Sequence, residues 1–210
     1  MSSTLDSRSK ADTNTIAGNK SNVSIQDLCM IAVFTAIISV LSQLSIPMPA
    51  GVPMTLQTLI IPIAGIVLGK KKGSYATLLY LLLGAVGVPV FAGFAGGFDK
   101  LIGMTGGFLV SFPVLSFTAG LGDEIGKKIS SGKKGISKTA VYFSLLVASL
   151  LIGATINYVI GTLWFMFVAK AGLMYSLTAC VFPFIPTAIV KIILVAVLGP
   201  ELKKRLSRFI

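Results

Sequence analysis

The amino-acid sequence predicts an all-α integral membrane protein with six transmembrane helices, both termini in the cytoplasm and a short second helix. Of its 210 residues, 54% are hydrophobic and only 12% are charged, whereas a soluble domain carries about 25% charged residues. So few charges cannot cover a water-exposed surface. The apolar residues also gather in six runs separated by short polar stretches, which is the pattern of a multi-pass membrane protein.

The chain divides into three parts by composition. Residues 1–26 are rich in Ser, Asn, Asp and Lys and lack the apolar stretch of a signal peptide, so they are expected to form a disordered cytoplasmic tail. Residues 27–200 hold the six apolar runs and are expected to form one membrane domain. Residues 201–210 form a basic cytoplasmic end.

Each apolar run is long enough, or nearly so, to cross the ~30 Å hydrocarbon core of a bilayer as a helix. The predicted spans are residues 28–46, 54–69, 74–91, 102–121, 139–169 and 177–199. The second run is short and contains Pro62. A short or broken segment at membrane depth is tolerated only against protein or a cavity, so this segment is expected to form the wall of a pocket.

The basic residues predict the orientation. With six spans, fifteen of the eighteen lysines and arginines fall on one side of the membrane, which the positive-inside rule makes the cytoplasmic side. Five or seven spans would scatter them over both sides. The other three are Lys100 and Lys170, on the outer side, and Lys191, inside the last span. Because the net charge of +11 lies in these short loops and ends, it indicates membrane topology and argues against nucleic-acid binding.

Three loops then face outward, at residues 47–53, 92–101 and 170–176. The second reads AGFAGGFDK and is rich in glycine and phenylalanine. This composition fits a flexible lid over a small ligand, and it fits a set of tight turns equally well.

The sequence lacks the groups that membrane catalysis and ion coupling require. It has no histidine, and all seven acidic residues lie outside the spans or at their ends, so no carboxylate pair is placed to relay protons or hold a metal. The two cysteines, Cys29 and Cys180, fall near opposite membrane faces, and we expect no disulfide between them. These absences predict a protein that is not an enzyme and has no metal and no cofactor of its own.

The stretch GIVLGKKKG from Gly65 to Gly73 is one residue short of a phosphate-binding loop and lacks its Ser or Thr. We interpret Gly65 and Gly69 as a close helix contact and the lysines as cytoplasmic anchors. A membrane domain without an energy source suggests a binding subunit that works with partners.

Four motifs carry a family resemblance. They read VPMTLQT at Val52–Thr58, AGIVLG at Ala64–Gly69, YLLLGAVGVPVFAGFAGG at Tyr80–Gly97 and GMTGG at Gly103–Gly107. In this order and spacing they closely resemble the BioY family, the biotin-binding S components of energy-coupling factor transporters. The resemblance extends over about residues 26–200, with Met104 where the family often has proline.

The resemblance implies a membrane-embedded biotin-binding subunit of a vitamin uptake transporter in the bacterial plasma membrane. Its implied partners are biotin, an ECF transmembrane coupling subunit and two ABC-type ATPases, with ATP used only by the partner subunits. One alternative is a protein that moves biotin, or a related small carboxylate vitamin, alone by facilitated diffusion. A more distant alternative is an intramembrane enzyme, which the lack of acid–base and metal-binding groups disfavours.

Two alanines on the first span match the docking surface that S components present to the coupling subunit. They are Ala32 and Ala36, in AVFTA. Small residues four apart share a helix face and allow another helix to approach closely.

A lysine inside the last span is the most unusual polar group. The family usually reads PFxPxDxxK there, and this chain reads PFIPTAIVK, so Lys191 matches the lysine while Ala188 replaces the aspartate. Lys191 could extend its side chain to the lipid headgroups. Alternatively it faces the bundle interior, where the carboxylate of the ligand would be its counter-ion.

Other polar and aromatic groups near the outer half of the bundle are candidate ligand contacts, each with a structural alternative. Thr55 and Gln57 could instead cap a helix, Asn157 could bridge two helices, and Tyr158 and Trp164 could be interfacial aromatic residues. The predicted ligand-binding residues are Thr55, Gln57, Tyr80, Phe91, Gly93, Phe94, Asn157, Tyr158, Trp164 and Lys191.

Overall fold

The computed structural model describes residues 24–48, 51–132 and 134–207. The predicted disordered tail therefore lies almost wholly outside the described residues, as does the end of the basic C-terminal segment. The first helix, α2 (Ile25–Ser42), begins three residues before the predicted span, because Ser24 caps it: the Ser24 hydroxyl accepts a hydrogen bond from the Gln26 amide at 3.3 Å.

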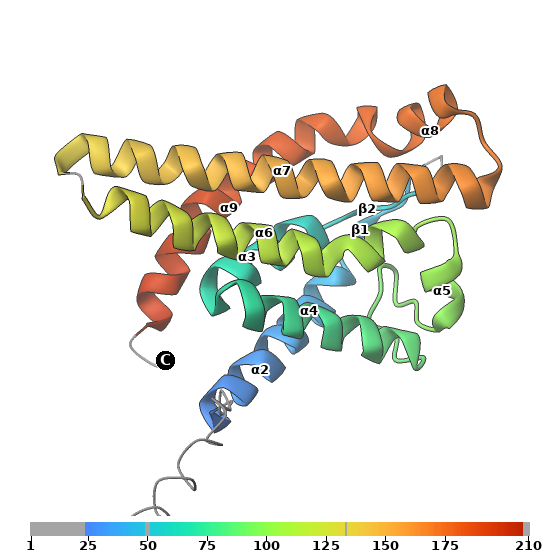
Figure 1. Cartoon of the computed structure of the whole chain (residues 1–210). Coiled ribbons are helices and arrows are strands. Elements are labelled where there is room, and N and C mark those ends of the chain that lie inside the picture. The colour runs from blue at the N-terminus through green and yellow to red at the C-terminus, as the bar shows by residue number, and fades with distance from the viewer. Residues whose placement is uncertain (1–23, 49–50, 133, 208–210) are drawn as a thin grey trace, which may run out of the picture.

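Helices make up most of the described chain, and two short strands pair near one end of the bundle (Figure 1). The strands are antiparallel, with Ser45 opposite Thr55. In chain order the elements after α2 are β1 (Ser45–Ile46), β2 (Met54–Thr55), α3 (Gln57–Leu68), α4 (Lys70–Ala85), α5 (Phe98–Ile102), α6 (Gly106–Ser130), α7 (Gly135–Ala169), α8 (Leu173–Cys180), the 3₁₀ turn η1 (Phe182–Phe184) and α9 (Ile185–Leu206).

Among the described residues, four helical stretches are long and apolar enough to cross a membrane: Ile25–Ser42, Gly106–Ser130, Gly135–Ala169 and Leu173–Leu206. Helix α3 is a shorter apolar helix of 12 residues, about 18 Å long at the rise of an α-helix. The protein is thus mostly helical and multi-pass, with the short second helix that the sequence predicts. The count of six spans and the side of the termini stay predictions.

Helix α4 differs from the predicted third span at both ends. Lys70, Lys71 and Lys72 form its first turn, directly after a bend at Gly69 with a φ of 86°, and so do not lie in a loop. The helix ends at Ala85 because Gly87, with a φ of 102°, and Pro89 follow it.

The predicted last span, 177–199, is not one continuous helix. The chain leaves α8 at Val181, passes through η1 and re-enters α9 at Ile185. Pro183 and Pro186 account for the break, because neither has an amide hydrogen to donate to a continuous helix. Both prolines can be read from the sequence, but the hydropathy of the run does not show the break, because the residues around Val181 are apolar.

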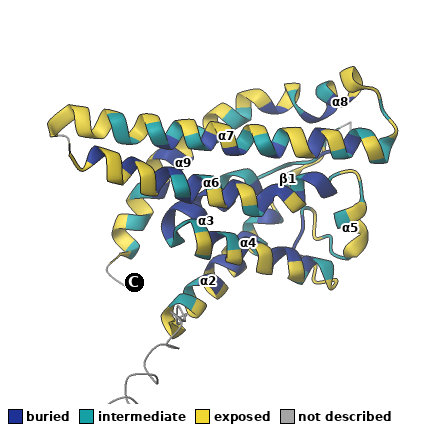
Figure 2. Ribbon diagram, viewed as in Figure 1, coloured by how far each residue is buried: buried dark blue, intermediate teal, exposed yellow. Residues whose placement is uncertain are grey.

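Helix α3 lies at the centre of the bundle. Nine of its twelve residues are buried, and it packs against α6, α4 and α9. The longer helices α6 and α7 run antiparallel beside each other, and their outer faces are largely exposed (Figures 1 and 2). Exposed apolar faces on a helical bundle are what contact with lipid requires.

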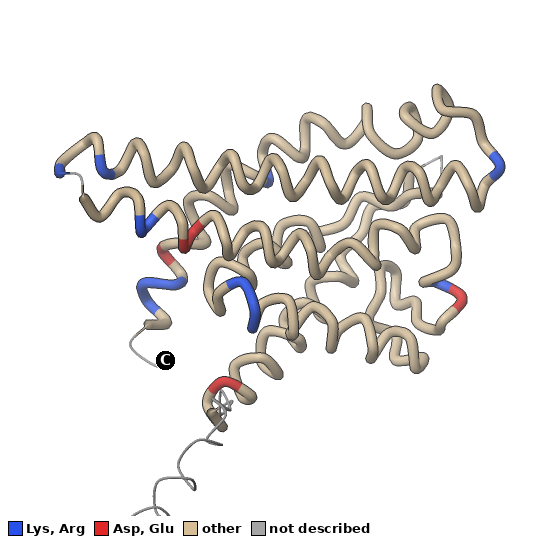
Figure 3. Tube along the Cα trace, viewed as in Figure 1, with Lys and Arg blue, Asp and Glu red and all other residues tan. Residues whose placement is uncertain are grey.

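The charges of the described residues divide between the two ends of the bundle (Figure 3). Lys100 and Lys170 lie at the end that carries α5 and α8. Most other described basic residues lie toward the opposite end, where α6 meets α7 and α9 ends. This separation agrees with the charge distribution predicted from the sequence.

Candidate functional site

A cavity of about 120 Å³ lies inside the bundle near the end that carries the strands and α5. It is formed by residues from β2, α3, the loop after α4, α5, α6, α7, α8, η1 and α9. Helix α3 supplies Gln57 and Thr58, so the short second helix does form part of the pocket wall, as predicted. Six of the ten predicted site residues line this cavity: Thr55, Gln57, Phe91, Asn157, Tyr158 and Lys191.

Lys191 projects from α9 toward the start of α3. Its Nζ donates hydrogen bonds to the Thr55 carbonyl oxygen at 2.6 Å and to Thr58 Oγ1 at 3.0 Å. This geometry contradicts the alternative in which the side chain extends to the lipid headgroups, because the ammonium is held against β2 and α3. Among the described residues no carboxylate lies within ion-pair distance of Lys191.

Ala188 stands where the resembled family usually has aspartate, and this replacement changes the surroundings of Lys191. Ala188 stands one turn before Lys191 on α9 and is not among the residues that line the cavity. An aspartate three residues before a lysine on a helix could pair with it. The alanine leaves Lys191 without that partner.

Thr55, Gln57 and Tyr80 form one hydrogen-bonded group. The Thr55 hydroxyl donates to Gln57 Oε1 at 2.8 Å, and Gln57 Nε2 donates to the Tyr80 hydroxyl at 2.7 Å. The hydroxyl of Thr55 also accepts a hydrogen bond from the Gln57 amide nitrogen at 3.3 Å. The N-cap of α3 is nevertheless Leu56, which provides no side-chain cap. Tyr80 is fully buried behind the cavity wall and supports Gln57 from there.

Asn157 performs the bridging role that was its structural alternative, and it also lines the cavity. Its Nδ2 donates to Ser111 Oγ at 2.6 Å and to the Phe108 carbonyl oxygen at 3.2 Å, which joins α7 to α6. No described residue donates a hydrogen bond to its Oδ1, which therefore stays available as an acceptor.

Aromatic rings form the apolar part of the cavity wall. Phe91 packs edge-on against Tyr80 with ring centroids 5.6 Å apart, and Tyr158 does the same with Phe108 at 6.4 Å. Phe91 is seated against α4 at Gly84, where a Cβ atom would lie 2.0 Å from its ring. Tyr158, which lies on α7, therefore forms part of the cavity wall.

Four predicted contacts do not line the cavity: Tyr80, which lies behind Gln57, and Gly93, Phe94 and Trp164. Gly93 and Phe94 lie in the loop after α4, both with positive φ, and the Phe94 side chain is 73% exposed. Gln43 ties this loop to α2, because its Nε2 donates to the Pro89 carbonyl oxygen at 2.7 Å and its Oε1 accepts from the Phe94 amide at 2.9 Å. Gln43 therefore holds this loop against α2, where it forms a turn.

Trp164 is the fourth predicted contact that does not line the cavity. Its Nε1 donates to the Gly103 carbonyl oxygen at 2.9 Å, and its side chain packs where a Cβ on Gly107 would lie 2.3 Å away. Trp164 therefore fastens α7 to the start of α6, and the glycines of the fourth motif allow this close approach.

Several cavity residues escaped the sequence reasoning. They are mostly apolar or small and have no distinguishing pattern of their own: Thr58, Phe108, Phe112, Cys180 and Phe184. Lys100 is different. It is one of only two lysines predicted on the outer side, and this rarity could have marked it as a candidate site residue. Lys100 and Lys191 are the two lysines among the lining residues, and Lys100 Nζ lies 3.4 Å from Asp99 Oδ2, which is not a lining residue.

Ala32 and Ala36 both lie on the exposed face of α2, opposite the buried Phe34 and Ile38. Both cysteines are free, with Cys29 exposed and Cys180 buried. Among the described residues, no group of three or more His, Cys, Asp or Glu side chains could hold a metal ion.

Comparisons with known proteins agree on one family. Residues 14–208 match the BioY family. The chain is 39% identical over 187 residues to "Biotin transporter BioY2" of Lactococcus lactis subsp. cremoris, covering 89% of this chain and 94% of that protein. It is 35% identical over 178 residues to "Probable biotin transporter BioY" of Pyrococcus horikoshii, covering 85% of this chain and 96% of that protein.

A solved structure shares the fold. The crystal structure of the S-component for biotin from an ECF-type ABC transporter superposes with a TM-score of 0.70 at 29% identity, covering 89% of this chain and 95% of that one. Since the family match extends over nearly the whole chain and two relatives exceed 30% identity across most of their length, this membrane protein belongs to the BioY family.

Proposed function

We propose that this chain is the biotin-binding subunit of a vitamin uptake transporter in the bacterial plasma membrane. Its family, the names of its relatives and the biotin S-component whose fold it shares support this function. The protein binds its solute within the membrane domain and does not alter it chemically.

The cavity matches the chemical parts of biotin. The ring system lies among the aromatic side chains, where apolar burial drives binding. The free Oδ1 of Asn157 accepts from a ureido N–H, and the Thr55–Gln57 pair offers further polar contacts at the same cavity. The valerate carboxylate lies toward Lys191.

The observation that carries the proposal is the unpaired Lys191. A half-buried ammonium with two neutral hydrogen-bond acceptors and no described carboxylate within 4 Å lacks a counter-ion. Charged groups in membrane interiors are costly without a partner. A ligand carboxylate supplies that partner and forms a charge-assisted hydrogen bond.

Equilibrium binding of labelled biotin to the purified protein in detergent tests the proposal. Wild type binds tightly, and Lys191→Met, which keeps the side-chain length but removes the charge, weakens binding by at least about thirtyfold, as expected for loss of a buried charge pair. Lys170→Met, an exposed lysine outside the cavity, is the matched control and keeps wild-type affinity.

Absence of binding by the folded wild type would overturn the biotin assignment. Equal affinity of wild type and Lys191→Met would instead overturn the role of the lysine while keeping the ligand.

We further propose six membrane crossings with both termini in the cytoplasm, and a complex with an ECF transmembrane coupling subunit and two ABC-type ATPases that use the ATP. The exposed Ala32 and Ala36 on α2 support docking of the coupling subunit there, because small side chains allow close helix contact. The charge separation of Figure 3 supports the orientation.

A further inference from the structure

A second hollow lies at the opposite end of the bundle from the biotin cavity. It is formed by the last turns of α6, the first turns of α7 and the last turns of α9. Four lysines line it: Lys127 from α6, Lys138 from α7, and Lys203 and Lys204 from α9. The proposed transport function does not use any of them.

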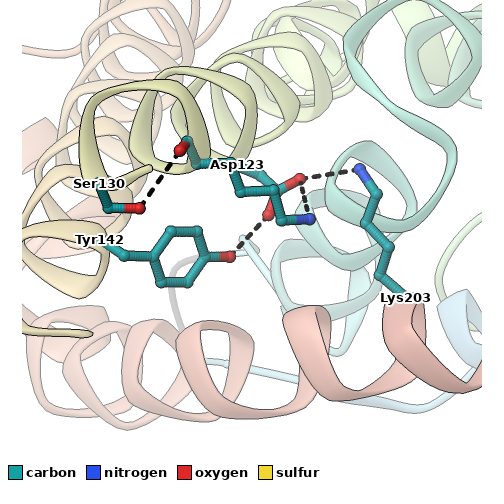
Figure 4. A network of polar contacts seen from close by, with 5 residues as sticks. Asp123, Ser130, Tyr142 and Lys203 are labelled. Atoms are coloured by element: carbon teal, nitrogen blue, oxygen red, sulfur yellow. Dashed lines mark hydrogen bonds and ion pairs between the residues drawn. The ribbon is translucent and has the colours of Figure 1, made fainter. Parts of the chain in front are cut away.

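A buried aspartate sets the positions of two of these lysines. Asp123 has no exposed surface, and its Oδ2 accepts from Lys127 Nζ at 3.0 Å and from Lys203 Nζ at 2.8 Å (Figure 4). The Tyr142 hydroxyl donates to the other carboxylate oxygen at 2.6 Å. Asp123 therefore joins α6, α7 and α9 behind the hollow and holds two ammonium groups at its wall.

The positive charge exceeds what Asp123 can neutralise. No described acidic side chain pairs with Lys138 or Lys204, and no acidic residue lines the hollow. Four lysines thus line one hollow, and a single buried carboxylate lies behind it. Such a concentration of charge attracts an anion.

The remaining lining groups indicate what kind of anion fits. The hydroxyl-bearing side chains Ser130, Thr139 and Ser207 lie beside the lysines, and Phe143 and Pro200 add apolar surface. The flanking face of α7 is largely exposed, so it contacts acyl chains in a membrane. A phosphate with hydroxyl groups on one side and an acyl chain on the other is complementary to this surface.

We propose that the hollow between α6, α7 and α9 binds the phosphate headgroup of an anionic phospholipid. The lysines contact the phosphate oxygens, the hydroxyl-bearing side chains contact the headgroup polyol, and the acyl chains run along the exposed flank of α7. Basic pockets between transmembrane helices bind anionic lipid headgroups by this chemistry. The bound lipid neutralises the lysines and links the three helix ends that Asp123 already joins.

The test is retention of phosphatidylglycerol by the full-length protein, measured by native mass spectrometry after exchange from mixed phosphatidylglycerol and phosphatidylcholine nanodiscs into detergent. Wild type retains phosphatidylglycerol in preference to phosphatidylcholine. The variant Lys138→Gln/Lys204→Gln loses this retention by roughly tenfold, as expected for two headgroup contacts. Both replaced lysines are exposed and lack a described ion-pair partner, so the fold is kept, as a single symmetric gel-filtration peak would verify.

The matched control is Lys128→Gln/Lys134→Gln, which removes the same charge from exposed positions at the same end but outside the hollow. It keeps wild-type retention. If both double variants lost phosphatidylglycerol retention equally, the site would be overturned, because general surface charge would then account for the retention. Equal retention in both would overturn it too.

A second arm separates the lipid from a free anion. Inorganic phosphate at 1–10 mM, roughly cellular in concentration, is added to the wild type during exchange, and it leaves phosphatidylglycerol retention unchanged because it lacks the acyl contacts that add affinity. Displacement of the lipid over this range would assign the hollow to a soluble phosphate and overturn the lipid proposal.

Discussion

At the scale of single residues, the candidate site depends on polar groups that hold one another in place. Gln57 is buried and has both ends of its amide occupied, by Thr55 on one side and by Tyr80 on the other. A buried amide without partners is unfavourable by about 1–3 kcal/mol. Tyr80 therefore acts on the cavity through Gln57, as a positioning residue that does not itself line it.

Tyr80→Phe tests this role. The substitution keeps the ring that packs on Phe91 and removes the acceptor for Gln57 Nε2. We expect the melting temperature to fall by several degrees and labelled biotin to bind about tenfold more weakly, because the Gln57 amide is no longer fixed. Tyr75→Phe, on an exposed position of the same helix, changes neither quantity. A Tyr80→Phe variant with wild-type affinity would show that Gln57 does not need this support.

At the scale of elements, α3, α4 and α6 meet at glycines. A Cβ on Gly65 would lie 2.0 Å from the Ser116 carbonyl oxygen, one on Gly73 would lie 2.6 Å from Gly65 Cα, and one on Gly120 would lie 2.5 Å from the Gly65 carbonyl oxygen. The helix backbones are in contact, so no side chain fits between them. The sequence-based interpretation of a close helix contact is confirmed for Gly65 at this crossing. It is wrong for Gly69, which forms the bend between α3 and α4 with a φ of 86° and has no backbone neighbour this close.

Ion pairs support the same elements at the lysine-rich end. Lys70 on α4 pairs with Glu124 on α6 at 2.7 Å, and Lys72 on α4 pairs with Asp27 on α2. These pairs are partly exposed, so each contributes little by itself. They join neighbouring helix ends, while the glycine contacts allow the helix backbones to approach closely.

Gly65→Ala tests the crossing. The added methyl group meets backbone on α6, which cannot rotate away, so overpacking is expected to destabilise the fold by about 1–3 kcal/mol. The measurement is the thermal unfolding midpoint in detergent. Gly132→Ala, at a position where a Cβ meets nothing within 4 Å, keeps the wild-type midpoint. If both variants unfolded at the wild-type temperature, the close contact would not be needed.

At the scale of the whole molecule, charge and cavity lie at opposite ends. The candidate cavity lies near α5 and the strands, where few charges lie, and the lysine-rich hollow lies where α6 and α9 end and α7 begins. A bilayer with the lysines on its cytoplasmic side would place the cavity near the outer surface. A solute would then enter from outside, and the lysine-rich end would face the ATPases.

Labelling of single cysteines tests this orientation. In a background with both native cysteines replaced by serine, Gly172→Cys places a thiol between α7 and α8, and Gly132→Cys places one between α6 and α7. Both positions are exposed. In intact cells a membrane-impermeant maleimide labels the Gly172→Cys variant, and it labels the Gly132→Cys variant only after the membrane is permeabilised. The reverse pattern would invert the predicted topology.

The sequence by itself determined the features that each segment shows independently of the others. The apolar runs, the short helix with Pro62 and the basic ends follow from transfer of each segment between water and lipid, which depends on local composition. Lys191 could be singled out in the same way, because a charge in an apolar run is rare. Helix breaks at Gly87 and Val181 shifted the limits of α4 and α9, since apolar residues continue through them.

The tertiary structure alone decided which side chains meet. Lys191 contacts Thr55 across 136 positions of sequence, and Asn157 contacts Ser111 across 46. The rotation of each helix about its axis selects such contacts, and that rotation is set by packing at sites such as the Gly65 crossing. The same packing turned Trp164 toward the start of α6 and left Phe94 exposed on its turn. Hydropathy does not predict these rotation angles, because lipid solvates every apolar face of a helix equally.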